Sequence, residues 1–99
     1  MGQSIQVVGT AAVNDVVIFA IDRGLTGMDS EEYNSAAEAA AGDGFGALLA
    51  TRLFASVDGI DRVFVAGNDV LVQRPDGWDE ASRDDARSII EDLFRFYPD

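Results

Sequence analysis

Carboxylates and guanidinium groups are the side chains with which this chain could do chemistry. It has eighteen acidic residues and seven arginines, but neither histidine nor cysteine. Without cysteine there is no disulfide, no thiolate nucleophile and no sulfur ligand for zinc or an iron–sulfur cluster. Without histidine there is no imidazole to activate a serine or to carry a proton near neutral pH. What remains is divalent-metal binding by carboxylates, acid–base work by paired carboxylates, or recognition through arginine.

The acidic residues are densest towards the C-terminal end of the chain. Five of them fall within ten positions: Asp76, Asp79, Glu80, Asp84 and Asp85. Their oxygens could bind a hard cation such as calcium or magnesium, but the Asp-x-Asp-x-Asp-Gly spacing of a calcium loop is absent. Acidic residues also favour the first turn of a helix. We therefore favour a solvated helix start, and a carboxylate-based divalent-metal-binding protein or small enzyme is the alternative function.

Three of the seven arginines, Arg52, Arg62 and Arg74, lie in or beside one expected helix and one expected hairpin. They could form a patch that recognises an acidic partner or a carboxylate. Because the chain has more than twice as many acids as bases, pairing within the molecule is the favoured interpretation.

Four aromatic residues near the C-terminus, Trp78, Phe94, Phe96 and Tyr97, recur at helical spacing and are expected to pack against a sheet. Phe96 falls off the main apolar stripe, so it is a candidate contact for a partner. The candidate partner-binding residues are Arg52, Leu53, Arg62, Trp78 and Phe96. No residue is assigned a catalytic, cofactor-binding or metal-ligating role.

The net charge of −11 repels phosphate backbones and anionic lipid surfaces, so neither a nucleic acid nor a membrane is an expected partner. Adaptation to high salt would explain such a charge, since salt screens the repulsion between carboxylates. Solubility alone is the plainer explanation, but we favour adaptation to high salt. The absence of lysine fits either that adaptation or a base-composition bias.

Length and hydropathy indicate one domain, residues 1–99, in the cytoplasm. The start, Met1-Gly2-Gln3-Ser4, has neither the basic region nor the apolar core of a secretory signal. The longest apolar run, Val16–Ile21, has the length of a strand and is far too short to span a membrane.

Alternating and β-branched apolar residues predict strands in the first third of the chain. Ser4–Val8 and Asp15–Asp22 are expected to form a hairpin around turn residues at Gly9–Asn14. The second of these strands is apolar on both faces, which indicates a central position in the sheet. Arg23–Asp29 is expected to be a loop, and residues 31–34 could form a short edge strand.

The middle of the chain predicts two helices. Ser35 is expected to cap an alanine-rich helix that runs to Ala41, and Asp43 is expected to cap a longer helix that ends near Gly59. The apolar stripe of the longer helix is expected to comprise Phe45, Leu48, Leu49 and Leu53.

The last third predicts a second hairpin and a final helix. Strands at Arg62–Ala66 and Asp69–Arg74 flank Gly67-Asn68, a pair typical of tight hairpin turns. The final helix is expected to begin at Trp78 or Asp79 and to run to Tyr97. The order β-β-(β)-α-β-β-α predicts an α+β two-layer sandwich. It would have a mainly antiparallel sheet of four to five strands, with two main helices on one face.

From Leu48 onward the chain resembles the N-terminal domain of Nfu/NifU-type iron–sulfur scaffold proteins. That family shows a Leu-Ala-x-x-Leu-Phe helix, an Asp-Gly turn, a short hairpin with a glycine in its turn, and a tryptophan before the last helix. The matching residues are Leu49, Ala50, Leu53, Phe54, Asp58, Gly59, Ile60, Val63, Phe64, Val65, Gly67, Asp69, Val70, Val72 and Trp78. Upstream, Thr10 and Asn14 resemble the family's Thr-Pro-Asn-Pro-Asn segment, but its prolines are missing here. The segment Phe54–Gly59 is also one residue longer than the family pattern.

In the family, the Cys-x-x-Cys cluster site belongs to a separate C-terminal domain, and this sequence contains no cysteine. The resemblance therefore implies a stand-alone N-terminal domain. We therefore expect a non-enzymatic protein-interaction module without a cofactor, an accessory or scaffold-related protein in iron–sulfur cluster assembly. It would act as a monomer or weak homodimer with an unidentified protein partner. Contacts are expected through the sheet face, an exposed edge strand, or the helix–hairpin junction around Leu53, Arg62 and Trp78. A homo-oligomeric structural protein is a third hypothesis.

Overall fold

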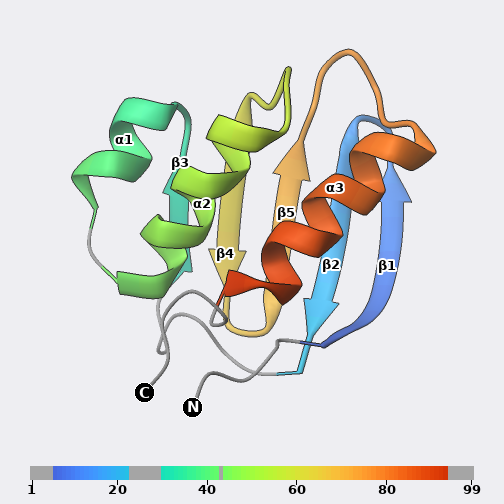
Figure 1. Ribbon diagram of the computed structural model, residues 1–99, viewed down its shortest axis with the longest axis horizontal. Helices are drawn as coiled ribbons and strands as arrows, with labels where there is room; N and C mark the ends of the chain where they lie inside the picture. Colours follow the sequence, from blue (N-terminus) through green and yellow to red (C-terminus); the bar gives the residue numbers. More distant parts are fainter. Residues whose placement is uncertain (1–5, 23–29, 43, 94–99) are drawn as a thin grey trace.

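A computed structural model describes residues 6–22, 30–42 and 44–93 of the chain. Five strands form one antiparallel sheet, and three helices pack against one of its faces (Figure 1). The elements in chain order are β1 (Val7–Val13), β2 (Val16–Ile21), β3 (Ser30–Tyr33), α1 (Ala36–Ala41), α2 (Gly44–Ser56), β4 (Arg62–Ala66), β5 (Asp69–Gln73) and α3 (Glu80–Glu91). The predicted α+β fold class is confirmed, with a short third helix beside the two main ones. None of the described helices is long and apolar enough to cross a membrane.

The strands lie in the order β1-β2-β5-β4-β3, and every neighbouring pair is antiparallel. The hairpins β1–β2 and β4–β5 therefore lie side by side, joined where β2 pairs with β5. This order places β1 and β3 at the two edges. The central position expected for the strand after residue 15 is confirmed by β2, and the short edge strand expected at residues 31–34 is confirmed by β3.

The first hairpin differs from the prediction. We expected a strand at Ser4–Val8 and a loop at Gly9–Asn14, whereas β1 continues through most of that loop and pairs with β2. The turn consists of only Asn14 and Asp15, and Asn14 has a φ of 57°, a left-handed conformation that asparagine tolerates well. Small residues such as glycine and alanine suffice in β1, because an edge strand buries little. They therefore resembled a loop.

The other turns and caps agree with the sequence. Ser35 caps α1, since its Oγ accepts the main-chain N–H of Glu38 at 3.1 Å. Gly59 and Gly67 have φ values of 83° and 59°, in the left-handed region where glycine is favoured. The expected loop at Arg23–Asp29 and the cap at Asp43 lie outside the described residues.

Helix α2 buries most of the expected stripe, since Leu49 and Leu53 have 0% exposure and Leu48 is half-buried, but Phe45 lies outside the buried side. Gly46, Ala50 and Leu53 face the sheet, whereas Phe45 is 46% exposed. Phe45 lies about a quarter-turn away from the centre of that buried side. The small residues let the helix approach the sheet closely, so the expectation that Phe45 belongs to the core is corrected.

Helix α3 starts where expected and ends early. Asp79 and Ser82 form a capping box: the Asp79 carboxylate accepts the Ser82 N–H at 2.7 Å, and the Ser82 hydroxyl accepts the Asp79 N–H at 3.0 Å. The helix ends at Glu91 rather than Tyr97, because Asp92 caps it with a ψ of 0° and Leu93 enters the core. Residues 94–99 lie outside the described part.

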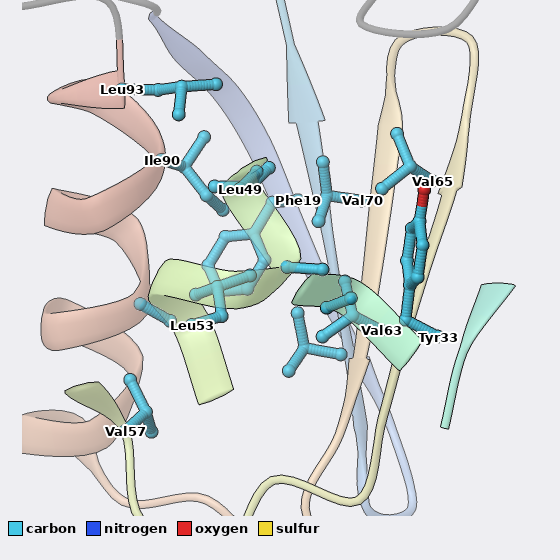
Figure 2. Close-up of a cluster of buried hydrophobic side chains, with 14 of the residues drawn as sticks. Phe19, Tyr33, Leu49, Leu53, Val57, Val63, Val65, Val70, Ile90 and Leu93 are labelled. Carbon is cyan, nitrogen blue, oxygen red and sulfur yellow. The ribbon is translucent and has the colours of Figure 1, made fainter. Parts of the chain in front are cut away.

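The core lies between the helices and the sheet, where the labelled side chains converge in Figure 2. Alternate residues of β2, β4 and β5 are buried in it. The largest fully buried side chains are Phe19, Leu49, Leu53, Ile90, Leu93, Val17, Val63, Val65, Val70 and Val72.

Candidate protein-binding surface

The structure does not bring the five candidate partner-binding residues together. Leu53 has 0% exposure in the core, so it cannot contact a partner in this fold (Figure 2). Its proposed contact role is corrected to packing. Arg62 lies in β4 and Trp78 lies in the loop before α3, while Phe96 lies outside the described residues. The predicted helix–hairpin junction is therefore not one surface.

Trp78 is half-buried and is used within the fold. Its indole N–H donates to the main-chain carbonyl of Asp15 at 2.9 Å, and its ring meets Phe19 edge to face with centroids 6.4 Å apart. These contacts fasten the β5–α3 loop to the β1–β2 turn. Both the apolar ring and the polar N–H are satisfied, so its role is structural.

The arginines have different partners within the fold. Arg74 donates from Nε to the carbonyl of Asp58 at 2.8 Å and from an Nη to the carbonyl of Gly77 at 2.5 Å. It thus ties the turn after α2 to the loop before α3. Arg62 pairs with Glu32 at 3.4 Å, across β4 and β3. The favoured interpretation, pairing with acidic side chains of the molecule, is confirmed for Arg62; Arg74 also bonds within the molecule, but to main-chain carbonyls.

Arg52 is half-buried on α2. It lines a hollow between α2 and the end of α3, together with Ser56, Ser88, Ile89 and Asp92. A polar side chain beside a carboxylate at a helix–helix seam suits internal packing more than recognition.

The acidic segment before and along α3 is not arranged as a metal centre. Within residues 6–22, 30–42 and 44–93, no three or more acidic side chains are placed to hold a metal ion together. Asp79 acts as the helix cap, and its hydrogen bonds from Ser82 lower the pKa of its carboxyl below the usual value. The favoured interpretation, a helix start, matches this geometry.

Tyr33 connects the β3 edge to the helical layer. Its hydroxyl donates to the Glu31 carboxylate at 2.6 Å, and burial, followed by that hydrogen bond and the nearby charge, raises its pKa to about 12. Its ring packs so closely on α1 that a Cβ added at Gly42 would lie 3.2 Å from it. This arrangement anchors α1 to the edge of the sheet.

The face of the sheet away from the helices carries an apolar stripe. Strand register aligns Ala11 with Ile18, Ile18 with Leu71, and Leu71 with Phe64, so the stripe crosses β1, β2, β5 and β4. We call this surface the open face, formed by Ala11, Val13, Val16, Ile18, Phe64 and Leu71. Apart from the more exposed Ala11 and Val13, these side chains are half-buried.

A shallow hollow of about 310 Å³ lies on the open face. Val16, Phe64 and Leu71 supply its apolar lining. Gln73 and the ion pair of Arg62 with Glu32 border it, and both charged side chains are about half exposed, at 49% and 44%. An apolar floor with a polar border is the usual composition of a protein-binding surface.

Part of the open face could be predicted from the sequence. A strand that is apolar on both faces was expected to be central, and β2 is indeed central. What the sequence could not supply was the register that aligns Ile18 with Leu71 and Phe64, because that depends on hairpins distant in the chain pairing with each other.

Comparisons with known proteins add a fold relationship. No protein-family profile matches the chain. No curated protein sequence matches it either. The crystal structure of protein SAV1430 from Staphylococcus aureus is similar over 93% of this chain and 99% of that one, with a TM-score of 0.60 and 13% sequence identity. At that identity the likeness concerns the fold alone, so the chain is similar in architecture to SAV1430 and the comparison assigns it no activity.

Proposed function

We propose that this chain is a non-enzymatic protein-interaction module that binds a partner protein through the open face. The observation that carries the proposal is the apolar stripe of Ile18, Leu71 and Phe64, over which none of the described helices lies. The helices of the described residues all pack on the other face. A contiguous apolar strip on a highly charged chain is a costly surface unless a partner covers it.

The charge of the chain specifies the chemistry of that partner. At −11, the protein attracts basic segments and repels acidic ones. The hollow over Leu71 and Phe64 suits apolar side chains from one side of a helix. The partner we propose is therefore an amphipathic helix whose apolar side is bordered by arginine or lysine.

The resemblance to the Nfu/NifU N-terminal domain gives the proposal its biological setting. The partner would be a component of iron–sulfur cluster assembly, and the chain an accessory to it. Because the chain has no cysteine, its contribution would be a contact with the assembly rather than ligation of a cluster through sulfur.

The test is capture of partners from a native extract with matched surface variants. The open-face variant Phe64→Ser/Leu71→Ser is compared with Phe45→Ser, which removes an exposed aromatic residue from the helical layer. We expect a basic protein to be retained by the wild type and by Phe45→Ser, and to be lost with the open-face variant. Circular dichroism confirms that each variant is folded.

Two outcomes would contradict the proposal separately. Equal retention by both variants would remove the open face as the binding surface. If the partner that binds the open face were unrelated to iron–sulfur assembly, the proposed role in that process would be wrong, but the proposed interaction function would still hold.

A further inference from the structure

The two edges of the sheet differ sharply in how they are protected. Edge strand β3 has four residues, carries Glu31 and Glu32, and lies beside α1 (Figure 1). Edge strand β1 has seven residues and no charge, and all but its first residue are exposed. Its Val8 and Val13 are 67% and 56% exposed. Charges and short length are the usual protection against strand pairing, and β1 has neither.

The backbone groups available at β1 can be identified from the ladder. Alternate residues of an antiparallel strand direct their N–H and C=O groups to opposite sides. The N–H of Asp22 donates to Gln6, on the β1 side, whereas the N–H of Ile21 donates to Asn68, on the other side of β2. Even-numbered residues of β2 therefore bond towards β1. Their partners in β1 are odd-numbered after the register shift at Val8, since Ile18 lies opposite Ala11. The N–H and C=O groups of Thr10 and Ala12 consequently point away from β2, towards the open side of β1.

We propose that two copies of this chain pair through β1, antiparallel about a twofold axis at Ala11. The regular part of β1 after the register shift, Gly9–Val13, then pairs with itself. Thr10 of each copy lies opposite Ala12 of the other, which forms about four main-chain hydrogen bonds. Val13 lies opposite Gly9, so an exposed valine packs where the other copy has no side chain.

Charge complementarity favours a second copy as the occupant of this edge. Beside β1, the hollow under α3 is lined by Thr10 and Phe19 together with Glu80, Arg83, Asp84 and Arg87. Those four charges sum to zero on a chain whose net charge is −11. The four charged residues that line this hollow alternate in sign along α3, so two antiparallel copies can place opposite charges against each other. Over most of the chain's surface, in contrast, two copies would meet with like charges.

Pairing through β1 would also extend the open face. Ala11 belongs to its stripe, and pairing at Ala11 would join the stripes of two copies into one continuous surface. The sheet would have ten strands, and the unprotected edges would be removed. The inference goes beyond the proposed function and does not depend on it, because β1 pairing involves the strand edge and partner binding involves the centre of the face.

The test is sedimentation velocity from micromolar to millimolar protein, with two variants at one position. Ala12→Pro removes an outward N–H without touching the β1–β2 ladder, whereas Ala12→Val keeps that N–H. We expect the wild type and Ala12→Val to form a dimer, and Ala12→Pro to weaken the association by about tenfold or more. Arg83→Glu/Arg87→Glu, which leaves the strand intact, is expected to weaken it as well.

Amide hydrogen exchange provides an independent readout. The N–H groups of Thr10 and Ala12 are expected to become protected as the wild-type concentration rises. A wild type that stays monomeric at millimolar concentration, a wild-type dimer in which the amides of Thr10 and Ala12 stay unprotected, or an equally strong dimer of Ala12→Pro would overturn the proposal. The open-face variant Phe64→Ser/Leu71→Ser should still dimerise, so failure of partner binding and failure of strand pairing are distinguishable.

Discussion

Substituting Leu53 by alanine distinguishes a role of Leu53 in core packing from a role in contacting a partner protein. Leu53 is fully buried between α2 and the sheet, so its truncation removes apolar contacts and leaves a cavity. Such a change costs about 3 kcal/mol of the free energy of unfolding. For a domain of this size that amounts to a fall in the melting temperature of roughly 15 °C.

Phe45→Ala is the matched comparison, because the sequence placed both residues on the same apolar stripe. Phe45 is 46% exposed, so we expect its truncation to cost less than about 1 kcal/mol. Denaturant unfolding, followed by far-ultraviolet circular dichroism and by the fluorescence of the single tryptophan, gives both free energies. A Leu53→Ala cost no larger than that of Phe45→Ala would refute the layer assignment on which the open face depends.

Three further predictions concern the helical layer. Gly42→Ala should cost about 1–3 kcal/mol of unfolding free energy, because its Cβ would come within 2.9 Å of a neighbouring side chain, whereas Gly9→Ala, with 3.9 Å of space, should be tolerated. Tyr33 should ionise near pH 12, so its contribution to stability is present below pH 10 and is lost between about pH 10 and pH 12. The difference in tyrosinate absorbance between the wild type and Tyr33→Phe measures this ionisation. An ordinary titration of Tyr33 near pH 10 would contradict the prediction. Asp79 has a lowered pKa, so its contribution to stability is present above the unfolded-state pKa and is lost as the pH falls through the folded-state pKa. Asp79→Ala should therefore reduce the loss of stability in acid, measured as the free energy of unfolding against pH.

Local chemistry made the second half of the fold predictable. The Gly67-Asn68 turn fixes the β4–β5 hairpin, and its alternating valines point into the core as expected. Ser35 could be predicted as a helix cap because capping depends on only a few consecutive residues. In such segments the sequence and the tertiary structure favour the same conformation.

The misassigned parts depend on packing between distant segments. Edge strand β1 carries small residues that resemble a loop, and only its pairing with β2 reveals it. Phe45 fits a helical period, but the side of α2 that faces the sheet is decided by how closely Gly46 and Ala50 let it approach. The expected contact role of Leu53 was wrong for the same reason, since spacing along a helix does not say what covers it.

The most direct test of the open face is methyl nuclear magnetic resonance with the captured partner. Methyl groups of Val16, Ile18 and Leu71 lie on the open face, whereas those of Val17 and Val72 lie in the core beneath the helices. Titration with the partner's basic amphipathic segment is predicted to shift the first group and to leave the second nearly unchanged. Shifts confined to methyl groups of the helical layer, with the open face unaffected, would contradict the account.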